Sequence, residues 1–203
     1  FRVLLAKLYF QQKNIFKSIE SLEQVLDVET DNVSAMIDLG EYYRLVNDHE
    51  KALFILGRAI EIAPEIDAIW VNYGTVLQQL ERSDEAIIAY QRALSINSNI
   101  AEVHSNLGVL YTSLGQLVFA VKCCERAIEI KPSLVEAHCN LGIAFKDLGR
   151  LDEAVISFKQ AVKINPNYPK AYSNLGIVYK DLGQFDEAVL SYKKALNIDP
   201  SYA

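Results

Sequence analysis

The feature that most constrains this sequence is a repeat of 34 residues. The segment from Ala137 to Pro166, AHCNLGIAFKDLGRLDEAVISFKQAVKINP, recurs from Ala171 to Pro200 as AYSNLGIVYKDLGQFDEAVLSYKKALNIDP. A fixed period in this range predicts stacked units that bury their apolar faces against one another. One array over 1–203 is expected, and because it begins inside a helical pattern we expect it to be a segment of a longer protein. Six repeats follow without an insertion: 1–32, 33–66, 67–100, 101–134, 135–168 and 169–202.

Each repeat is predicted to form two helices. In the last repeat the spaced residues follow i, i+3, i+4, i+7 in the first segment and i, i+4, i+7, i+8 in the second, which indicates two helices that each bury one face. Gly183 lies between them and supplies the left-handed residue that closes a helix. Asp186 then places a carboxylate at the start of the second helix, where the helix dipole favours it. The spaced residues are Tyr172, Leu175, Gly176 and Tyr179, then Ala188, Tyr192, Ala195 and Leu196.

Small residues recur at fixed places. We number positions 1 to 34 within a repeat, so that Pro200 is at position 32. A glycine occupies position 8 of five repeats, and alanines occupy positions 20 and 27 of most of them. We interpret them as spacing residues that let two helix backbones approach closely. The glycines are Gly40, Gly74, Gly108, Gly142 and Gly176.

These residues resemble the tetratricopeptide repeat, through NLG followed by an aromatic residue three positions on, DEA in the second helix and a closing proline. The resemblance extends over essentially all 203 residues. It implies an all-α fold, a right-handed superhelical solenoid of about six helix-turn-helix repeats whose first helices line a concave groove. The sequence departs from the pattern early, since the glycine between the helices is replaced by Lys13, Asn47 and Glu81 in the first three repeats.

Asparagines recur at position 6, on the face of the first helix expected to line the groove. An asparagine offers an acceptor and two donors, so it can bracket a peptide group of an extended ligand. The alternative is that these side chains cap or brace neighbouring helices. They are Asn72, Asn106, Asn140 and Asn174.

Two further sets of side chains are predicted to face the groove. An apolar stripe at position 9 suits an apolar strip of a partner, although packing between repeats is an equal alternative. Lysines at positions 2 and 12 add cations, with Asp147 and Asp181 following two of them. The stripe is Val109, Ile143 and Ile177, and the lysines are Lys146, Lys170 and Lys180.

No constellation in the sequence predicts catalysis, a cofactor or a metal. His104 and His138 share position 4 of adjacent repeats, so neighbouring helices hold them roughly 8–10 Å apart. Zinc needs each nitrogen at about 2.1 Å, so the two cannot share one ion. Cys139 at position 5 is expected on the groove side, but no histidine base is placed beside it. We therefore expect a protein that is not an enzyme.

The net charge and the hydropathy of the sequence limit the kinds of partner that we expect. The net charge is −6, and residues 1–100 carry 9 basic against 15 acidic side chains, whereas 101–203 carry 11 of each. A polyanion is repelled by the first half, so nucleic acid is not expected as a partner. No apolar run approaches the roughly 18 residues that span a bilayer. Three cysteines without metal spacing favour a reducing compartment, and we predict a cytoplasmic location.

Three functions follow as hypotheses. The leading one is a protein-protein interaction scaffold that binds a peptide or partner protein in its groove. In the second, the repeats are the substrate-recruiting arm of a larger glycosyltransferase, because the asparagines and NLG units resemble those of O-linked N-acetylglucosamine transferases. The third is a self-assembling scaffold. An array needs a polar end, so without a further helix the last one is expected to expose Val189, Tyr192 and Leu196.

The early departures predict uneven local stability. In a stack where each repeat touches only its neighbours, defects stay local. Amide protons of repeats one and two should therefore exchange faster than those of repeats four and five in native-state hydrogen exchange. Uniform protection along the chain would contradict this prediction.

Overall fold

The computed structural model describes residues 1–201, and these contain twelve α-helices and no strand. Each repeat supplies two helices, so the predicted all-α fold of helix-turn-helix repeats is confirmed. By its internal contacts the chain divides into two compact bodies, which we call the N-terminal body (Phe1–Ser98) and the C-terminal body (Asn99–Ala203). Each is described by itself.

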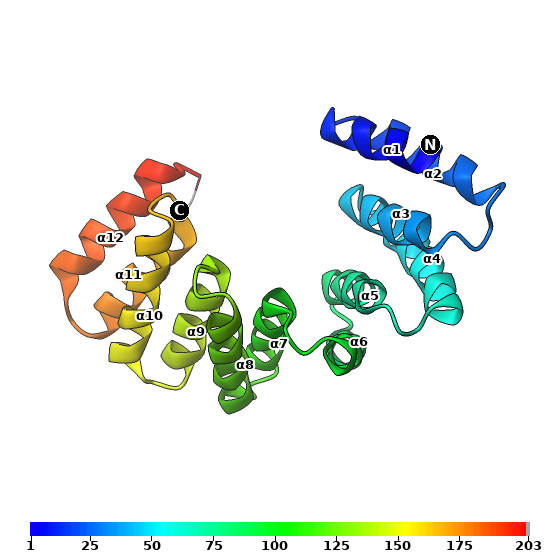
Figure 1. The fold of residues 1–203 in the computed structure, drawn as a ribbon. Coiled ribbons are helices and arrows are strands. Elements are labelled where there is room, and N and C mark those ends of the chain that lie inside the picture. The colour runs from blue at the N-terminus through cyan, green and yellow to red at the C-terminus, as the bar shows by residue number, and fades with distance from the viewer. Residues whose placement is uncertain (202–203) are drawn as a thin grey trace. The chain divides into compact units, whose positions relative to one another are not determined.

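The N-terminal body holds repeats one to three. The two helices of each repeat pack on each other, and within this body α2 packs on α3 and α4 packs on α5 (Figure 1). Leu22, Met36 and Leu56 are completely enclosed between them. The helices are α1 (Arg2–Gln11), α2 (Ile15–Leu26), α3 (Val33–Leu45), α4 (His49–Ile62), α5 (Asp67–Gln79) and α6 (Ser83–Ile96).

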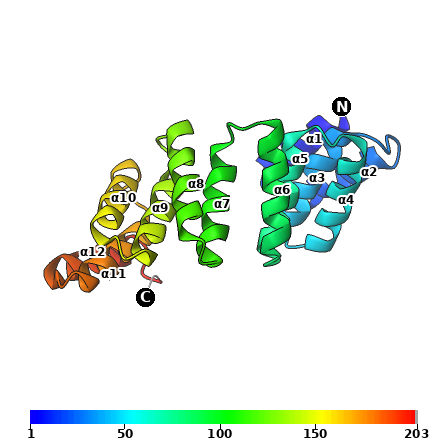
Figure 2. The same cartoon turned by 90° about the horizontal axis from the view of Figure 1, so that it is seen from below.

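The C-terminal body repeats the arrangement. Figure 2 shows α7 and α8 side by side as one hairpin, and α9 with α10 and α11 with α12 pair in the same way. Phe158, Val178 and Cys124 lie at the centre of its core. The helices are α7 (Ala101–Ser113), α8 (Leu117–Ile130), α9 (Val135–Asp147), α10 (Leu151–Ile164), α11 (Pro169–Asp181) and α12 (Phe185–Ile198).

The glycines at position 8 are the points of closest approach within each hairpin. A Cβ atom placed on Gly142 would lie 2.7 Å from the ring of Phe158, and one on Gly40 would lie 2.6 Å from Leu56. The same conflict arises in the other three repeats that carry the glycine, always with the side chain at position 24. The predicted spacing role is therefore confirmed: the glycine makes room for a large side chain from the partner helix.

The turn between the two helices needs a left-handed residue in every repeat. Gly115, Gly149 and Gly183 have φ of 71°, 75° and 74°. The residues that replace glycine in the first three repeats, at positions 13, 47 and 81, keep the same conformation, with φ of 59°, 61° and 58°. A left-handed non-glycine residue costs roughly 1–2 kcal/mol. The turn is thus fixed by helix packing, and the early repeats retain it despite the strain.

Helix caps offset part of this cost in the N-terminal body. The side-chain oxygens of Asn14, Asn32 and Asp48 accept hydrogen bonds from backbone N–H groups at the starts of α2, α3 and α4, at 3.3, 3.0 and 3.3 Å. Such a cap stabilises a helix by about 0.5–2 kcal/mol relative to alanine. The helices of the C-terminal body begin without a side-chain cap.

The glycine contacts predict opposite effects of one substitution at two sites. Gly142→Ala should lower the free energy of unfolding by about 1–2 kcal/mol, because overpacking against Phe158 outweighs the gain in helix propensity. Gly57 lies inside α4 with no neighbour in reach of an added Cβ. Gly57→Ala should therefore raise the free energy of unfolding by about 0.5–1 kcal/mol. Urea unfolding followed by circular dichroism measures both, and a loss at both sites would contradict the contact argument.

Candidate functional site

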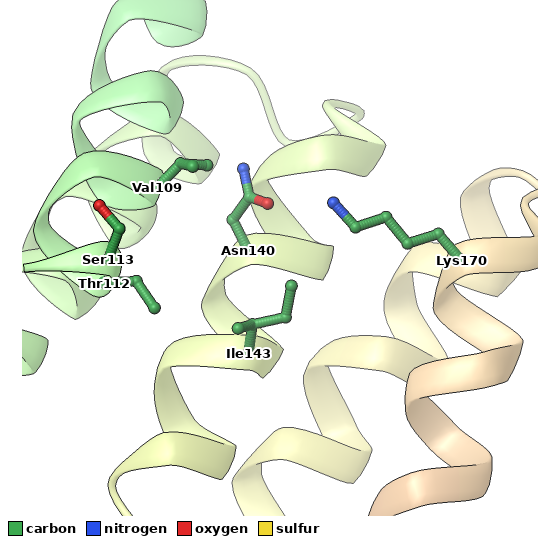
Figure 3. A pocket seen from close by; sticks show the side chains of 6 residues that line it. All are labelled: Val109, Thr112, Ser113, Asn140, Ile143 and Lys170. Atoms are coloured by element: carbon green, nitrogen blue, oxygen red, sulfur yellow. The ribbon is translucent and has the colours of Figure 1, made fainter. Parts of the chain in front are cut away.

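A pocket opens where the first helices of repeats four to six lie next to one another. In the C-terminal body α9 contacts both α7 and α11. Residues from these three helices enclose a volume of about 210 Å³ on this surface, which we call the first-helix face (Figure 3). The pocket is lined by Val109, Thr112, Ser113, Asn140, Ile143 and Lys170.

The pocket wall is mainly apolar. Val109 is partly exposed and Ile143 is half-buried, so both present aliphatic surface to a ligand. The hydroxyl of Thr112 donates to the carbonyl oxygen of Gly108 at 2.8 Å, and that of Ser113 donates to a carbonyl of its own helix. Because both hydroxyl protons are engaged within α7, the pocket favours an apolar ligand group.

Asn140 lies between the apolar wall and the lysine. Its amide nitrogen donates to the hydroxyl of Ser105 at 3.0 Å, and both side chains are buried. Figure 3 shows the carbonyl oxygen of Asn140 on the side of Lys170. A ligand that donates a hydrogen bond, such as a peptide N–H, can reach this oxygen from the pocket.

The same bracing recurs between other repeats. Asn174 donates to the backbone oxygen of Lys170 at 2.9 Å and lies 4.0 Å from the sulfur of Cys139, while Asn72 in the N-terminal body donates to the backbone of Ile37 at 3.5 Å. Asn72, Asn140 and Asn174 thus reach back to position 5 of the preceding repeat. A bracing role accompanies any role in binding, and Asn106 lies half-buried at the same position of α7.

Position 5 is buried in repeats four and five. Cys139 is completely buried and Ser105 is buried as well, so the expectation that Cys139 is reachable from the groove is wrong. The reason is that the asparagine of the next repeat packs over this position. Burial raises the pKa of the Cys139 thiol to about 11 and that of Cys124 to about 12. Neither is a thiolate nucleophile near neutral pH.

The three predicted lysines differ in their surroundings. Lys146 pairs with Asp147 at 3.1 Å, and Lys180 lies 4.0 Å from Asp181. Lys170 is half-buried at the pocket edge and forms no ion pair with any of residues 1–201. Its charge also lowers the pKa of Cys139 by more than Glu136 raises it. The pocket therefore has a positive edge.

The structure gathers four of the ten predicted site residues into this pocket, namely Val109, Asn140, Ile143 and Lys170. Ile177 and Asn174 follow on α11, and Asn72 belongs to the N-terminal body. Thr112 and Ser113 were missed as site residues. Their repeat positions, 12 and 13, are groove positions in the register, and that register is the signal that identifies them.

His138 has a structural partner in the preceding repeat. A ring nitrogen of His138 lies 2.9 Å from the carbonyl oxygen of Pro132. Likewise, the indole N–H of Trp70 donates a hydrogen bond to the carbonyl oxygen of Pro64 at 2.8 Å. In both cases a position 4 ring meets the closing proline of the preceding repeat. Across the described chain, no three His, Cys, Asp or Glu side chains cluster to hold a metal ion. Nor does any helix within residues 1–201 have the length and apolar character to cross a membrane.

The bracing hydrogen bond predicts a measurable coupling. Asn140→Ala and Ser105→Ala each remove one partner, so a double-mutant cycle on the free energy of unfolding should give a coupling of about 0.5–1.5 kcal/mol. Ser157 is the matched control, because its buried hydroxyl bonds within α10. A cycle of Asn140→Ala with Ser157→Ala should give additive losses, and equal coupling in both cycles would contradict the contact.

Family models of known proteins match most of this sequence. Models described as "TPR repeat" match residues 74–115 and 144–183. Those described as "Tetratricopeptide repeat" match residues 33–66, 101–134, 123–156 and 169–202. A search of curated proteins finds no match.

Solved structures share the fold. PilW, a type IV pilus biogenesis factor, is 22% identical and covers 100% of this chain and 93% of its own, with a TM-score of 0.89. YrrB is 24% identical, with 90% and 94% covered and a TM-score of 0.70. MamA is 25% identical, with 79% and 94% covered and a TM-score of 0.72. The helical repeats, the position 8 glycines and the family models together establish that this chain belongs to the tetratricopeptide repeat family.

Proposed function

We propose that this chain is an interaction scaffold that binds an extended segment of a partner protein on the first-helix face of its C-terminal body. The observation that carries the proposal is the apolar pocket between α7, α9 and α11. It combines an aliphatic wall, an amide oxygen and Lys170, which forms no ion pair within residues 1–201, and together these suit an apolar side chain attached to a peptide backbone.

The pocket also sets how long the segment must be. Burying one aliphatic side chain contributes about 1.5–3 kcal/mol. A hydrogen bond to Asn140 adds about 0.5–1.5 kcal/mol. A dissociation constant of 1 μM requires about 8 kcal/mol, beyond the cost of association. A tight ligand must therefore extend past this pocket, and Asn174 and Ile177 continue the surface on α11.

Support from related structures is limited to the fold. YrrB is described as a TPR protein with an unusual peptide-binding site, so this fold can carry such a site. The substrate-recruiting arm of a glycosyltransferase would use the same face, and that alternative stays a prediction about sequence beyond these residues. The expectations of a cytoplasmic location and of no nucleic-acid partner also stay predictions.

A peptide selection tests the proposal. A random peptide library displayed on phage is selected against the immobilised 203-residue chain, and enriched peptides are synthesised for fluorescence anisotropy. Val109→Asp should weaken binding about tenfold or more, because a carboxylate in the apolar pocket costs at least 1.4 kcal/mol of binding free energy. Ile143→Ala should weaken it in the same direction by removing wall surface.

Ile156→Asp is the matched control, because Ile156 is exposed on α10, away from the pocket. This variant should bind within about twofold of the unmodified chain. All variants are first shown by circular dichroism to retain their helix content. No enriched peptide, or equal losses for Val109→Asp and Ile156→Asp, would contradict binding at this pocket.

A further inference from the structure

A second kind of pocket lies between successive second helices, away from the first-helix face. In the N-terminal body a pocket of about 350 Å³ is walled by α2, α3 and α4, and in the C-terminal body one of about 200 Å³ is walled by α10, α11 and α12. We call them the α2/α4 pocket and the α10/α12 pocket. They occupy equivalent places in the repeat, because residues at positions 7, 11, 19, 22, 23, 25 and 28 line both.

An apolar side chain at position 22 stands at the rim of each pocket. Phe54 is 69% exposed beside the α2/α4 pocket and Leu190 is 56% exposed beside the α10/α12 pocket. Ile88 and Ile156, at the same position in other repeats, are 64% and 60% exposed. Ile156 is exposed to this extent although repeat six packs against repeat five, to which Ile156 belongs. The exposure of Leu190 therefore belongs to the position and does not depend on where the chain ends.

The charges at the two rims are reversed. At position 25 the α2/α4 pocket has Glu23 where the α10/α12 pocket has Lys159, and at position 19 it has Lys51 where the other has Glu187. In each pocket the lysine lies over a tyrosine ring. The ammonium nitrogen of Lys51, on α4, is 5.3 Å from the ring centre of Tyr43, and that of Lys159, on α10, is 5.8 Å from the ring centre of Tyr179. The two surfaces are thus alike in shape and opposite in charge.

The exposed face of α12 matches the α2/α4 pocket in particular. Glu187, Leu190 and Lys194 are spaced i, i+3, i+7 and lie on one face of the helix. The wall that α2 gives to the α2/α4 pocket carries Glu23 and Asp27. Asp27 makes no ion pair among the described residues.

We infer that α12 of one copy of this chain docks across the α2/α4 pocket of a second copy. Leu190 enters the apolar pocket, Lys194 faces the acidic wall of Glu23 and Asp27, and Glu187 faces Lys51 on the opposite wall. The N-terminal body also carries the whole net charge of −6, so it attracts the lysines of α12.

The association is weak and depends on salt. Its core is one aliphatic side chain, and exposed ion pairs add little each. Screening shortens the reach of the charges as ionic strength rises, so the docking weakens at high salt. Such an interface joins copies of this chain only where their local concentration is high. It also leaves the first-helix face open to a partner.

Sedimentation velocity on the 203-residue chain tests the inference, from about 10 μM to about 1 mM, where weak association is visible. The mean sedimentation coefficient should rise with concentration. Leu190→Ala should weaken association about tenfold by emptying the pocket. Lys194→Glu and Glu23→Lys should each weaken it about fivefold, because each places like charges in contact. The double variant with both changes should recover most of the loss, since the charges then match in reverse.

Matched controls are Ile156→Ala, at the same repeat position, and Lys122→Glu, on the exposed surface of α8. Both should associate as the unmodified chain does. A chain that stays monomeric up to the highest concentration would overturn the inference. So would equal effects of Leu190→Ala and Ile156→Ala, or a double variant no better than its single variants.

Discussion

Five of the hairpins in this protein depend on the close approach of two helices at the position 8 glycine. The ring of Phe158 occupies the space that a Cβ atom on Gly142 would need, and the other repeats that carry this glycine use Leu56, Tyr90, Cys124 or Tyr192 in the same way. Because the side chain at position 24 lies against the glycine, the two backbones pack closely, and Leu56, Tyr90, Cys124 and Phe158 are completely buried. The remaining core follows from this contact, since it fixes the face that each helix turns toward the next repeat.

Hydrogen bonds between neighbouring repeats join the hairpins to one another. Asn140 and Asn174 reach back to position 5 of the preceding repeat, and the rings at position 4 reach the closing proline carbonyl. These hydrogen bonds hold first helices side by side, and the pocket forms on the surface they create. Asn140 therefore serves structure and site together: its amide N–H braces α7 against α9, while its oxygen faces the pocket.

The two proposed interactions use different sides of the hairpins. The first-helix face offers an apolar pocket with a positive edge at Lys170, suited to a partner segment. The α2/α4 and α10/α12 pockets lie between second helices and carry opposite charges. A scaffold that gathers copies through one side and holds a partner on the other raises the local concentration of what it binds.

The two helices of each repeat and the spacing glycines follow from the sequence, because a repeated period places every residue relative to its neighbours. Lys13, Asn47 and Glu81 mark the limit of that reasoning: they depart from glycine, yet packing imposes the left-handed turn on them. The sequence also predicted the pocket residues Val109, Asn140, Ile143 and Lys170 by register.

Only the tertiary structure decided which of the predicted side chains are free to bind. Cys139 is buried under the next repeat, Lys146 is paired with Asp147, and Lys170 has no carboxylate partner among residues 1–201. Periodicity says which face a residue occupies, but the side chain that covers Cys139 comes from Asn174, in a helix 35 residues further along the chain. Whether a donor or a charge is already satisfied therefore depends on distances that the order of residues does not contain.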